Sequence, residues 1–339
     1  MKHHKKTPCE GDAGRHLAEG LDEPCNSLSA FHSRLDRYSS ARSWAYSMVK
    51  HLEPDHHIRQ LSKEYKALRS CGSYLLFRHY FTVDEYRLAA LKSCKKHLLC
   101  PLCALRRGSK NLTAYLQRYE AIRAENPDLR PYMVTMAIKN GDDLKERFDH
   151  LNASLRKLFQ RRRDARKGRP TPSALQFVDG AVWTFEVSNQ GKGWHPHVHM
   201  IALAKWPPDQ RALRDEWESI TGDSWTCDVS RKEGQTDLQM FMEAFKYAVK
   251  FGDLSLEQTI HVYRTLRGRR LIASMGSFRS VKVPPDNTDE QLDDHPYVDL
   301  LYKFAYGKGY YLANVSKPVN PGGSPPPKGR VYSPPNKTS

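Results

Sequence analysis

The stretch WHPHVHMIAL at residues 194–203 decides the first inference about the fold. Its second half, from Val198 to Leu203, is an apolar run with the length of a buried strand. Because side chains on a strand alternate between two faces, His197 and His199 are predicted to point the same way. Two imidazoles held side by side on a rigid strand are a favourable start for a metal site.

The segments around this strand predict an α+β fold. Residues 181–187 form a second expected strand, and the Gly-rich segment 189–193 between the two strands fits a hairpin connection. The simplest architecture for such a mixture is an antiparallel sheet with helices packed on one face. The hydrophobic pattern also predicts a strand at 131–138 and helices at 105–125, 142–167, 208–221 and 238–250.

Glu186 lies on the neighbouring expected strand, where its carboxylate can supply an oxygen ligand beside the two histidines. Such a set suits Mn²⁺ or Mg²⁺ in a phosphate-transfer site, although zinc would also accept it. A cation there would polarise a scissile phosphate. The alternative for Glu186 is a salt bridge within the sheet. His195, which precedes Pro196, is a further candidate ligand or, equally, a supporting or DNA-contacting residue.

A second candidate group lies in the expected helix at 238–250. Glu243 and Tyr247 are four residues apart, so they share one face of a helix, and Lys250 lies on that face as well. A nearby ammonium favours the phenolate form, which a phenol of pKa about 10 needs in order to attack at neutral pH. Glu243 is then a candidate general base for water in a later step. The simpler interpretation makes Tyr247 an aromatic at the core edge and Glu243 a solvated charge.

Three cysteines cluster upstream of these groups. Cys94, Cys100 and Cys103 include a C-x₂-C pair, and Cys71 is the expected fourth thiol. Two to four thiolates with such a pair are typical of a structural zinc site. His97 is the alternative fourth ligand, and free buried cysteines are the alternative to zinc.

The charge of the chain points to a polyanionic partner. The 339 residues carry a formal net charge of +16, which indicates nucleic acid or an anionic membrane surface. No apolar run approaches the roughly 18 residues of a membrane span, and the basic N-terminus lacks the apolar stretch of a signal peptide, so we expect a cytoplasmic protein with reduced or metal-bound cysteines. The expected phosphate contacts are Arg106, Arg107, Arg161, Arg162 and Arg163.

Composition suggests four regions. Residues 1–40 are polar and expected to be disordered, and residues 41–127 are expected to form a helical segment with the cysteine cluster. Residues 128–283 hold the histidine strand and the Glu243–Lys250 helix. Residues 284–339 begin with an acidic loop, continue with a remnant of strand or helix and end in a Pro-rich tail expected to be disordered.

Taken in order, these motifs resemble the rolling-circle plasmid replication initiators of the Rep type, which are single-tyrosine HUH endonucleases. The resemblance runs from about Cys71 to Arg279. One departure is that five residues separate Cys94 from Cys100, where the family pattern leads us to expect four. The motifs that carry it are HVH at 197–199 with His-Pro before it, EAFKYAVK at 243–250, MVTM at 133–136, CPLCALRR at 100–107, and GRRL at 268–271 with GSF at 276–278.

This resemblance implies a fold and a mechanism. The fold is a five-stranded antiparallel sheet with flanking helices, plus a small N-terminal zinc-binding segment. Tyr247 would attack a phosphodiester of the plasmid origin, forming a 5′-phosphotyrosine and a free 3′-OH primer, with Lys246 and Lys250 on the DNA. A cation held by the histidines would assist, and Glu243 would activate water for termination. Partners would include origin DNA and a host helicase and polymerase.

Other interpretations remain open at this point. An HUH transposase or relaxase would use the same chemistry, although a glutamate four residues before the tyrosine suits termination by hydrolysis. A non-enzymatic nucleic-acid-binding protein with zinc would need the basic runs and cysteines only. A zinc hydrolase that uses water as nucleophile would form no covalent DNA adduct.

Overall fold

The periodic apolar residues fold into two sheets with helices around them. The computed structural model describes residues 27–53, 61–245, 251–282, 292 and 295–320. The predicted α+β class, with antiparallel sheets and flanking helices, is confirmed.

One antiparallel sheet carries the histidine strand at its centre. Its strands are β3 (Arg130–Ala137), β4 (Gly180–Ser188), β5 (His195–Ala204), β6 (Cys227–Ser230) and β7 (Ile272–Gly276). Their order is β6-β3-β5-β4-β7, so that β5 has two neighbours on each side. The predicted hairpin is the β4–β5 pair, in which Glu186 lies opposite His197 and Thr184 lies opposite His199.

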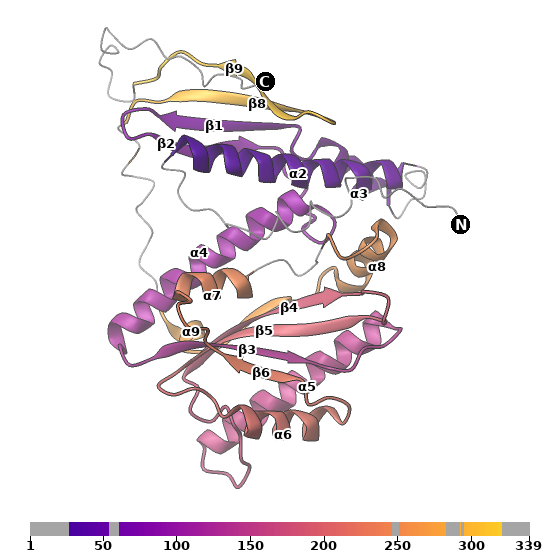
Figure 1. Ribbon diagram of the computed structural model, residues 1–339, viewed down its shortest axis with the longest axis vertical. Coiled ribbons are helices and arrows are strands. Elements are labelled where there is room, and N and C mark those ends of the chain that lie inside the picture. The colour runs from indigo at the N-terminus through magenta and orange to yellow at the C-terminus, as the bar shows by residue number, and fades with distance from the viewer. Residues whose placement is uncertain (1–26, 54–60, 246–250, 283–291, 293–294, 321–339) are drawn as a thin grey trace.

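Helices cover both faces of this sheet, whereas the simplest prediction has them on one. The helices involved are α4 (Pro101–Glu125), α5 (Leu144–Arg166), α6 (Gln210–Thr221) and α7 (Asp237–Ala244). On β5, Val198 and Met200 face α5 and α6, whereas Ile201 and Leu203 face α4 and α7. Beyond the histidines both sets of alternating side chains are apolar, so each face needs a helical cover. Figure 1 shows α5 and α6 below the sheet and α4 and α7 above it.

A second antiparallel sheet joins segments from the two ends of the chain. Its strands are β1 (Tyr74–Tyr80), β2 (Glu85–Leu91), β8 (Val298–Ala305) and β9 (Gly309–Val315), in the order β2-β1-β8-β9. The hydrophobic pattern of the sequence does not predict these strands. Composition also places residues 41–127 and 284–339 in separate regions, whereas strands from both regions form this one sheet. Helix α4 runs from this sheet to the five-stranded one (Figure 1).

The prediction of disorder for residues 1–40 is wrong for residues 28–40, because they belong to helix α2 (Leu28–Leu52). Ser27 caps the start of this helix, and its side chain accepts a hydrogen bond from the Ala30 backbone at 3.3 Å. Phe31 and Leu35 are buried one turn apart. Their apolar stripe is diluted by charged neighbours, which hides it in a polar segment. Residues 1–26 lie outside the described residues.

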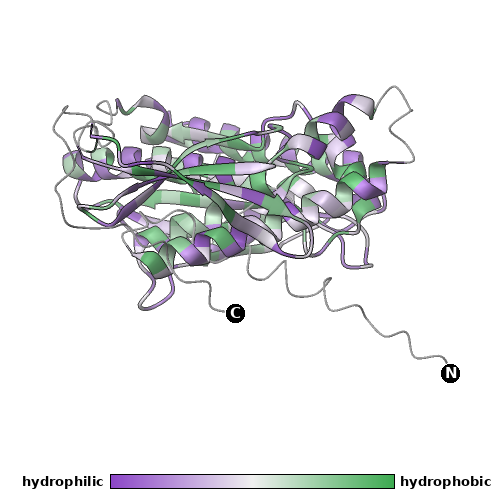
Figure 2. Ribbon diagram, turned by 90° about the horizontal axis from the view of Figure 1, so that it is seen from above, coloured by the Kyte–Doolittle hydropathy of each residue, from purple (hydrophilic) through white to green (hydrophobic). Residues whose placement is uncertain are grey.

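The remaining helices are α3 (Ser62–Ser70), α8 (Leu256–Leu266) and α9 (Ser277–Ser280). Gly222 ends α6 with a φ of 71°, the left-handed conformation that glycine adopts without strain. Viewed from above, the helices show hydrophilic and hydrophobic stretches in turn, as amphipathic helices do (Figure 2). Among the described residues no helix is long and apolar enough to cross a membrane.

Candidate metal centre and its surroundings

Glu186, His197 and His199 come together on one face of the five-stranded sheet. The Nε2 atom of His197 lies 3.4 Å from one carboxylate oxygen of Glu186, and the Nε2 atom of His199 lies 3.3 Å from the other. Candidate ligand atoms of all three residues lie within 4.8 Å of one another. The strand alternation predicted from the sequence therefore brings all three side chains to one point.

Hydrogen bonds on the far side of each imidazole fix its orientation. The Nδ1 atom of His197 lies 3.4 Å from the backbone carbonyl of His195, and that of His199 lies 3.2 Å from the Thr135 hydroxyl. A carbonyl oxygen only accepts, so Nδ1 of His197 donates and a neutral ring carries its lone pair on Nε2, toward Glu186. This second contact is typical of metal-ligating histidines.

The donor set fits a divalent cation. Two Nε2 atoms and a carboxylate converge, and the Glu186 side chain is only 5% exposed. Such a buried carboxylate is stabilised by a cation between it and the two rings. These residues suit Mn²⁺, Mg²⁺ or zinc by chemistry alone.

His195 shares the histidine face but lies outside this trio. Its Nδ1 atom is 2.7 Å from the side-chain oxygen of Asn140, and its ring stacks on His197 with centroids 5.1 Å apart. It therefore supports His197 in this geometry. Sequence reasoning missed Asn140 as a neighbour of this site, because the loop after β3 gives no periodic signal. Thr135 could have been found, since strand alternation puts it on the histidine face.

Helix α7 ends beside the histidines. The Thr184 hydroxyl, opposite His199 in the sheet, donates to the Ala244 carbonyl at 2.5 Å. Helix α7 is described from Asp237 to Ala244, and residues 246–250 of the helix predicted at 238–250 lie outside the described residues. Glu243 lies in its last turn and accepts a hydrogen bond from Gln235 at 3.4 Å. Lys246, Tyr247 and Lys250 lie outside the described residues.

A described tyrosine on the same face offers a contrast. Tyr119 on α4 donates to the Asp237 carboxylate at the start of α7. Burial, followed by the neighbouring Asp237 carboxylate, raises the pKa of Tyr119 to about 12. Its hydroxyl thus anchors α7 to α4 and is poorly suited to form a phenolate at neutral pH.

The four predicted cysteines also converge. The Sγ atom of Cys71 lies 3.6 Å from those of Cys100 and Cys103, and Cys94 lies 3.4 Å from Cys103. These separations are far longer than a disulfide bond of about 2.05 Å and close to the edge of about 3.8 Å expected of a zinc–sulfur tetrahedron. The backbone amide of Cys94 donates to the sulfur of Cys71 at 3.3 Å. The residues present therefore fit one zinc ion.

A thiolate is favoured at Cys103, where this cluster meets α4. Cys100 caps the helix and Cys103 lies in its first turn, where the helix dipole stabilises negative charge. Hydrogen bonds from the neighbouring thiols, that of Cys100 first, hold the pKa of Cys103 well below its usual range. His97, the alternative ligand, lies outside the four-sulfur group and contacts Arg107 at 3.2 Å. Burial, and then the Arg107 charge, lower the pKa of His97 to about 4.

Arg107 lies near the point where the chain leaves α7. Together with Thr184 and Phe245 it lines a small cavity of about 40 Å³ between α4 and the sheet. Phe245 is two residues before Tyr247 in the sequence. Arg106, its neighbour on α4, is exposed.

The predicted basic run on α5 lies elsewhere. Helix α5 packs on the face opposite the histidines, so Arg161 and Arg163 are remote from the metal centre. The prediction of Arg162 as a phosphate contact is wrong. Its side chain is buried and its guanidinium donates to the Val178 carbonyl at 3.2 Å and to the Asp179 carbonyl at 3.2 Å. A side chain used to satisfy two carbonyls in the interior cannot reach a DNA backbone.

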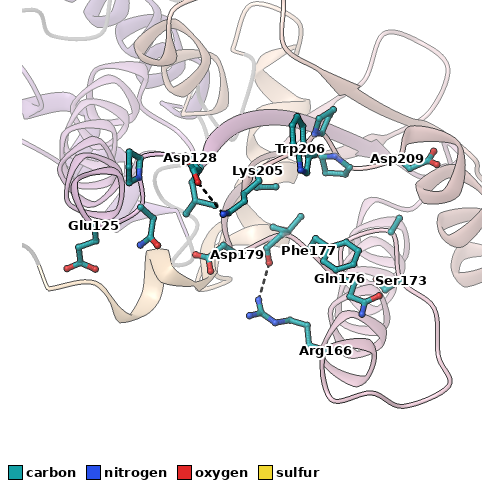
Figure 3. Close-up of a pocket in the computed structure, with 18 residues that line it drawn as sticks. Glu125, Asp128, Arg166, Ser173, Gln176, Phe177, Asp179, Lys205, Trp206 and Asp209 are labelled. Carbon is teal, nitrogen blue, oxygen red and sulfur yellow. Dashed lines mark hydrogen bonds and ion pairs between the residues drawn. The ribbon is translucent and has the colours of Figure 1, made fainter.

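A cavity of about 950 Å³ lies at the opposite end of β5 from the histidines. The exposed aromatic side chains of Phe177 and Trp206 line this cavity, as Figure 3 shows. Lys205 forms an ion pair with Asp128 at 3.2 Å. Its charged lining residues are Glu125, Asp128, Asp179, Asp209, Arg166 and Lys205. Carboxylates outnumber cations there, which makes it unsuited to phosphate.

Comparisons with known proteins point to replication proteins. Residues 85–208 match the family described as "Replication protein". The chain is similar to a protein named "Protein rep" of Lactiplantibacillus plantarum, with 26% identity over 260 residues that cover 69% of this chain and 77% of that protein. It is also similar to a "Protein rep" of Streptococcus pneumoniae serotype 2 (strain D39 / NCTC 7466), with 24% identity over 232 residues, 63% of this chain and 66% of that protein.

No solved structure matches the chain. The family match covers β2 to β5 and thus includes three of the four clustered cysteines and all three residues of the metal centre. These matches support the resemblance to the Rep proteins that the motifs indicate.

Proposed function

We propose that this chain initiates plasmid rolling-circle replication by nicking one strand of the origin through tyrosyl transfer. The observation that carries this proposal is the convergence of Glu186, His197 and His199 on a central strand beside the end of α7. The similarity to proteins named for replication supports it, as does the net charge of +16.

Each residue has a distinct role in the proposed reaction. The Tyr247 hydroxyl gives up its proton to solvent or a neighbouring base, and its oxygen attacks the scissile phosphorus. The bond to the 3′ oxygen breaks, and that oxygen takes up a proton to become a 3′-OH, while the 5′-phosphate stays on Tyr247. A divalent cation on the histidines and Glu186 would supply positive charge to the phosphate. Arg107 is suited to hold a flanking phosphate.

The reaction then ends by transfer of the phosphate away from the tyrosine. Glu243 would accept a proton from water, whose oxygen attacks the phosphotyrosine and restores Tyr247 as the leaving group. Rejoining to a 3′-OH gives the same release. The 3′-OH from the first step would be a primer for a host polymerase, with a host helicase opening the duplex.

We also propose zinc on Cys71, Cys94, Cys100 and Cys103. The four sulfurs lie between β1, β2 and the start of α4, so a zinc ion there would fix the first turn of the helix that carries Arg106 and Arg107.

The test is cleavage of labelled single-stranded origin DNA with Mn²⁺, followed on denaturing gels. We expect a covalent protein–DNA band that disappears in Tyr247→Phe and His199→Ala and persists in the controls Tyr311→Phe and His32→Ala. Cleavage without an adduct would support a hydrolase, and binding without cleavage under a range of metals would support a binding protein. An adduct that forms but is not released in Glu243→Gln would favour an initiator over a transposase or relaxase.

A further inference from the structure

A cavity of about 650 Å³ lies on the face of the five-stranded sheet opposite the histidines. It opens between α5 and the edge strand β7. Ala273 of β7 pairs with Trp183 of β4, and its small side chain leaves room that the α5 side chains do not fill. The residues that line it are Phe148, Asp149, Asn152, Ala153, Arg156, Trp183, Phe185, Arg269, Arg270 and Ala273.

The charge in this cavity is positive. Three arginines face one carboxylate in the lining, that of Asp149. Asp149 already binds Arg269 and the Lys145 ammonium, the latter at 3.0 Å. Hydrogen bonding to Arg269, reinforced by that to Lys145, lowers the pKa of Asp149. The charges of Arg156 and Arg270 therefore remain for a ligand, and both residues are exposed.

The wall of the cavity is aromatic. Phe148 and Phe185 lie with ring centroids 5.0 Å apart, and Trp183, which is half-buried, stacks at a tilt on Phe159 at 4.5 Å. Aromatic rings next to arginines are the combination that takes up a nucleobase and its phosphate. The Asn152 amide adds both a donor and an acceptor for a base edge or a sugar.

The position of the cavity relates it to the nick site. Trp183 and Glu186 lie three residues apart on β4 and therefore on opposite faces of the sheet. On this side β7 is the edge strand and β4 is next to it. A single strand that leaves the histidine face thus passes only β7 before it reaches the cavity.

We propose that this cavity binds a nucleotide unit of single-stranded DNA, with its phosphate on Arg156 and Arg270 and its base against Trp183. This inference rests on the proposed nicking function for the identity of the ligand. It also gives the GRRL segment at 268–271 a role that the nicking mechanism does not use.

The test measures the affinity of the full chain for a long oligothymidylate as a function of salt. Removing a charged hydrogen bond to phosphate lowers affinity by about tenfold, so we expect such losses in Arg156→Ala and in Arg270→Ala. The slope of affinity against salt should fall by about one for each lost contact. Arg211→Ala, an exposed arginine on α6, is the charge-matched control, and Arg270→Lys should recover part of the loss.

Nicking of a short origin oligonucleotide is measured on the same variants to keep the two proposals apart. Unchanged nicking together with weakened long-strand binding supports the cavity. Losses no larger than those of Arg211→Ala overturn it. If thymidine monophosphate or inorganic phosphate binds saturably and competes with the oligonucleotide, the ligand of the cavity is a free nucleotide or anion and not a DNA strand. If neither the wild type nor any variant nicks, the proposed nicking function fails. Affinity losses that persist in Arg156→Ala and Arg270→Ala would then still support binding of single-stranded DNA in the cavity.

Discussion

At the scale of single residues, groups outside the candidate donor set orient the two histidines of the candidate metal centre. Thr135 on β3 contacts His199 Nδ1 at 3.2 Å, and the His195 carbonyl holds His197. Both contacts come from the sheet, where neighbouring strands fix the distance between paired residues. A rotated imidazole would present its lone pair away from Glu186, so the threonine should matter although it lies outside the donor set.

Thr135→Val tests this contact. We expect the apparent affinity for Mn²⁺ in the nicking reaction to fall by about 10- to 100-fold, because the imidazole of His199 loses the hydrogen bond that orients it. Activity should return at saturating Mn²⁺. Thr265→Val on α8 is the control, and a Thr135→Val enzyme with the metal dependence of the wild type would show that the hydroxyl has no such role.

His79, on β1 of the four-stranded sheet, is expected to make the free energy of unfolding depend on pH. Its ring stacks on Tyr86 at 4.0 Å, and burial lowers its pKa, an effect that the Asp84 carboxylate at 3.1 Å only partly opposes. The folded state therefore favours the neutral ring. The contribution of His79 to the free energy of unfolding is therefore fully present above the unfolded-state pKa of about 6.5. It is lost as the pH falls through the lower pKa of the folded state.

We expect the free energy of unfolding, measured by denaturant titration, to decrease between about pH 7 and about pH 5, and His79→Gln to reduce this decrease. His32→Gln, at an exposed position, should leave the pH dependence unchanged. Equal slopes for both variants would assign the pH dependence to other groups.

At the scale of elements, strand alternation and thiol spacing predicted more than helix pattern did. The spacing predicted that Glu186 can reach the two histidines and that Cys71 joins the three clustered cysteines, although a salt bridge of Glu186 and His97 as fourth ligand stayed open. The four-stranded sheet was missed as a unit because the pairing of β1 with β8 links residues more than 200 positions apart, which no local pattern encodes. Arg162 was misassigned because a charge run does not reveal which of its members turns inward.

Helix α4 begins at the cysteine cluster and packs on the histidine face of the five-stranded sheet, which gives a prediction for zinc removal. Stripping the protein with a thiol-reactive reagent and chelator, then returning Mn²⁺ alone, should leave nicking strongly reduced. The first turn of α4 would lose its anchor, and with it the placement of Arg106 and Arg107 near the nick site. Zinc added back should restore activity. Full activity with Mn²⁺ alone and no bound zinc, measured by metal analysis, would separate the cysteine cluster from nicking.

At the scale of the whole molecule, the C-terminal strands close the fold over the cysteine cluster. β8 pairs with β1, and the Tyr310 hydroxyl on β9 donates to the Gly72 carbonyl at 2.6 Å, next to Cys71. Gly72 has a φ of +63°, and a Cβ there would lie 2.5 Å from Leu102 on α4. The turn that presents Cys71 is therefore contacted by α4 and by β9, so a tyrosine of the C-terminal sheet reaches the candidate zinc site.

Tyr310→Phe tests this long-range coupling. Removing the hydroxyl leaves the Gly72 carbonyl without its donor, so the free energy of unfolding should fall by about 1 to 3 kcal/mol. Zinc should also be released faster to a competing chelator, because Cys71 follows the movement of its neighbour. Tyr311→Phe is matched in chemistry and adjacent in sequence, but its side chain is 46% exposed. It should change neither quantity. If both variants lose stability equally while zinc release stays at the wild-type rate, the C-terminal sheet stabilises the fold without acting on the metal site.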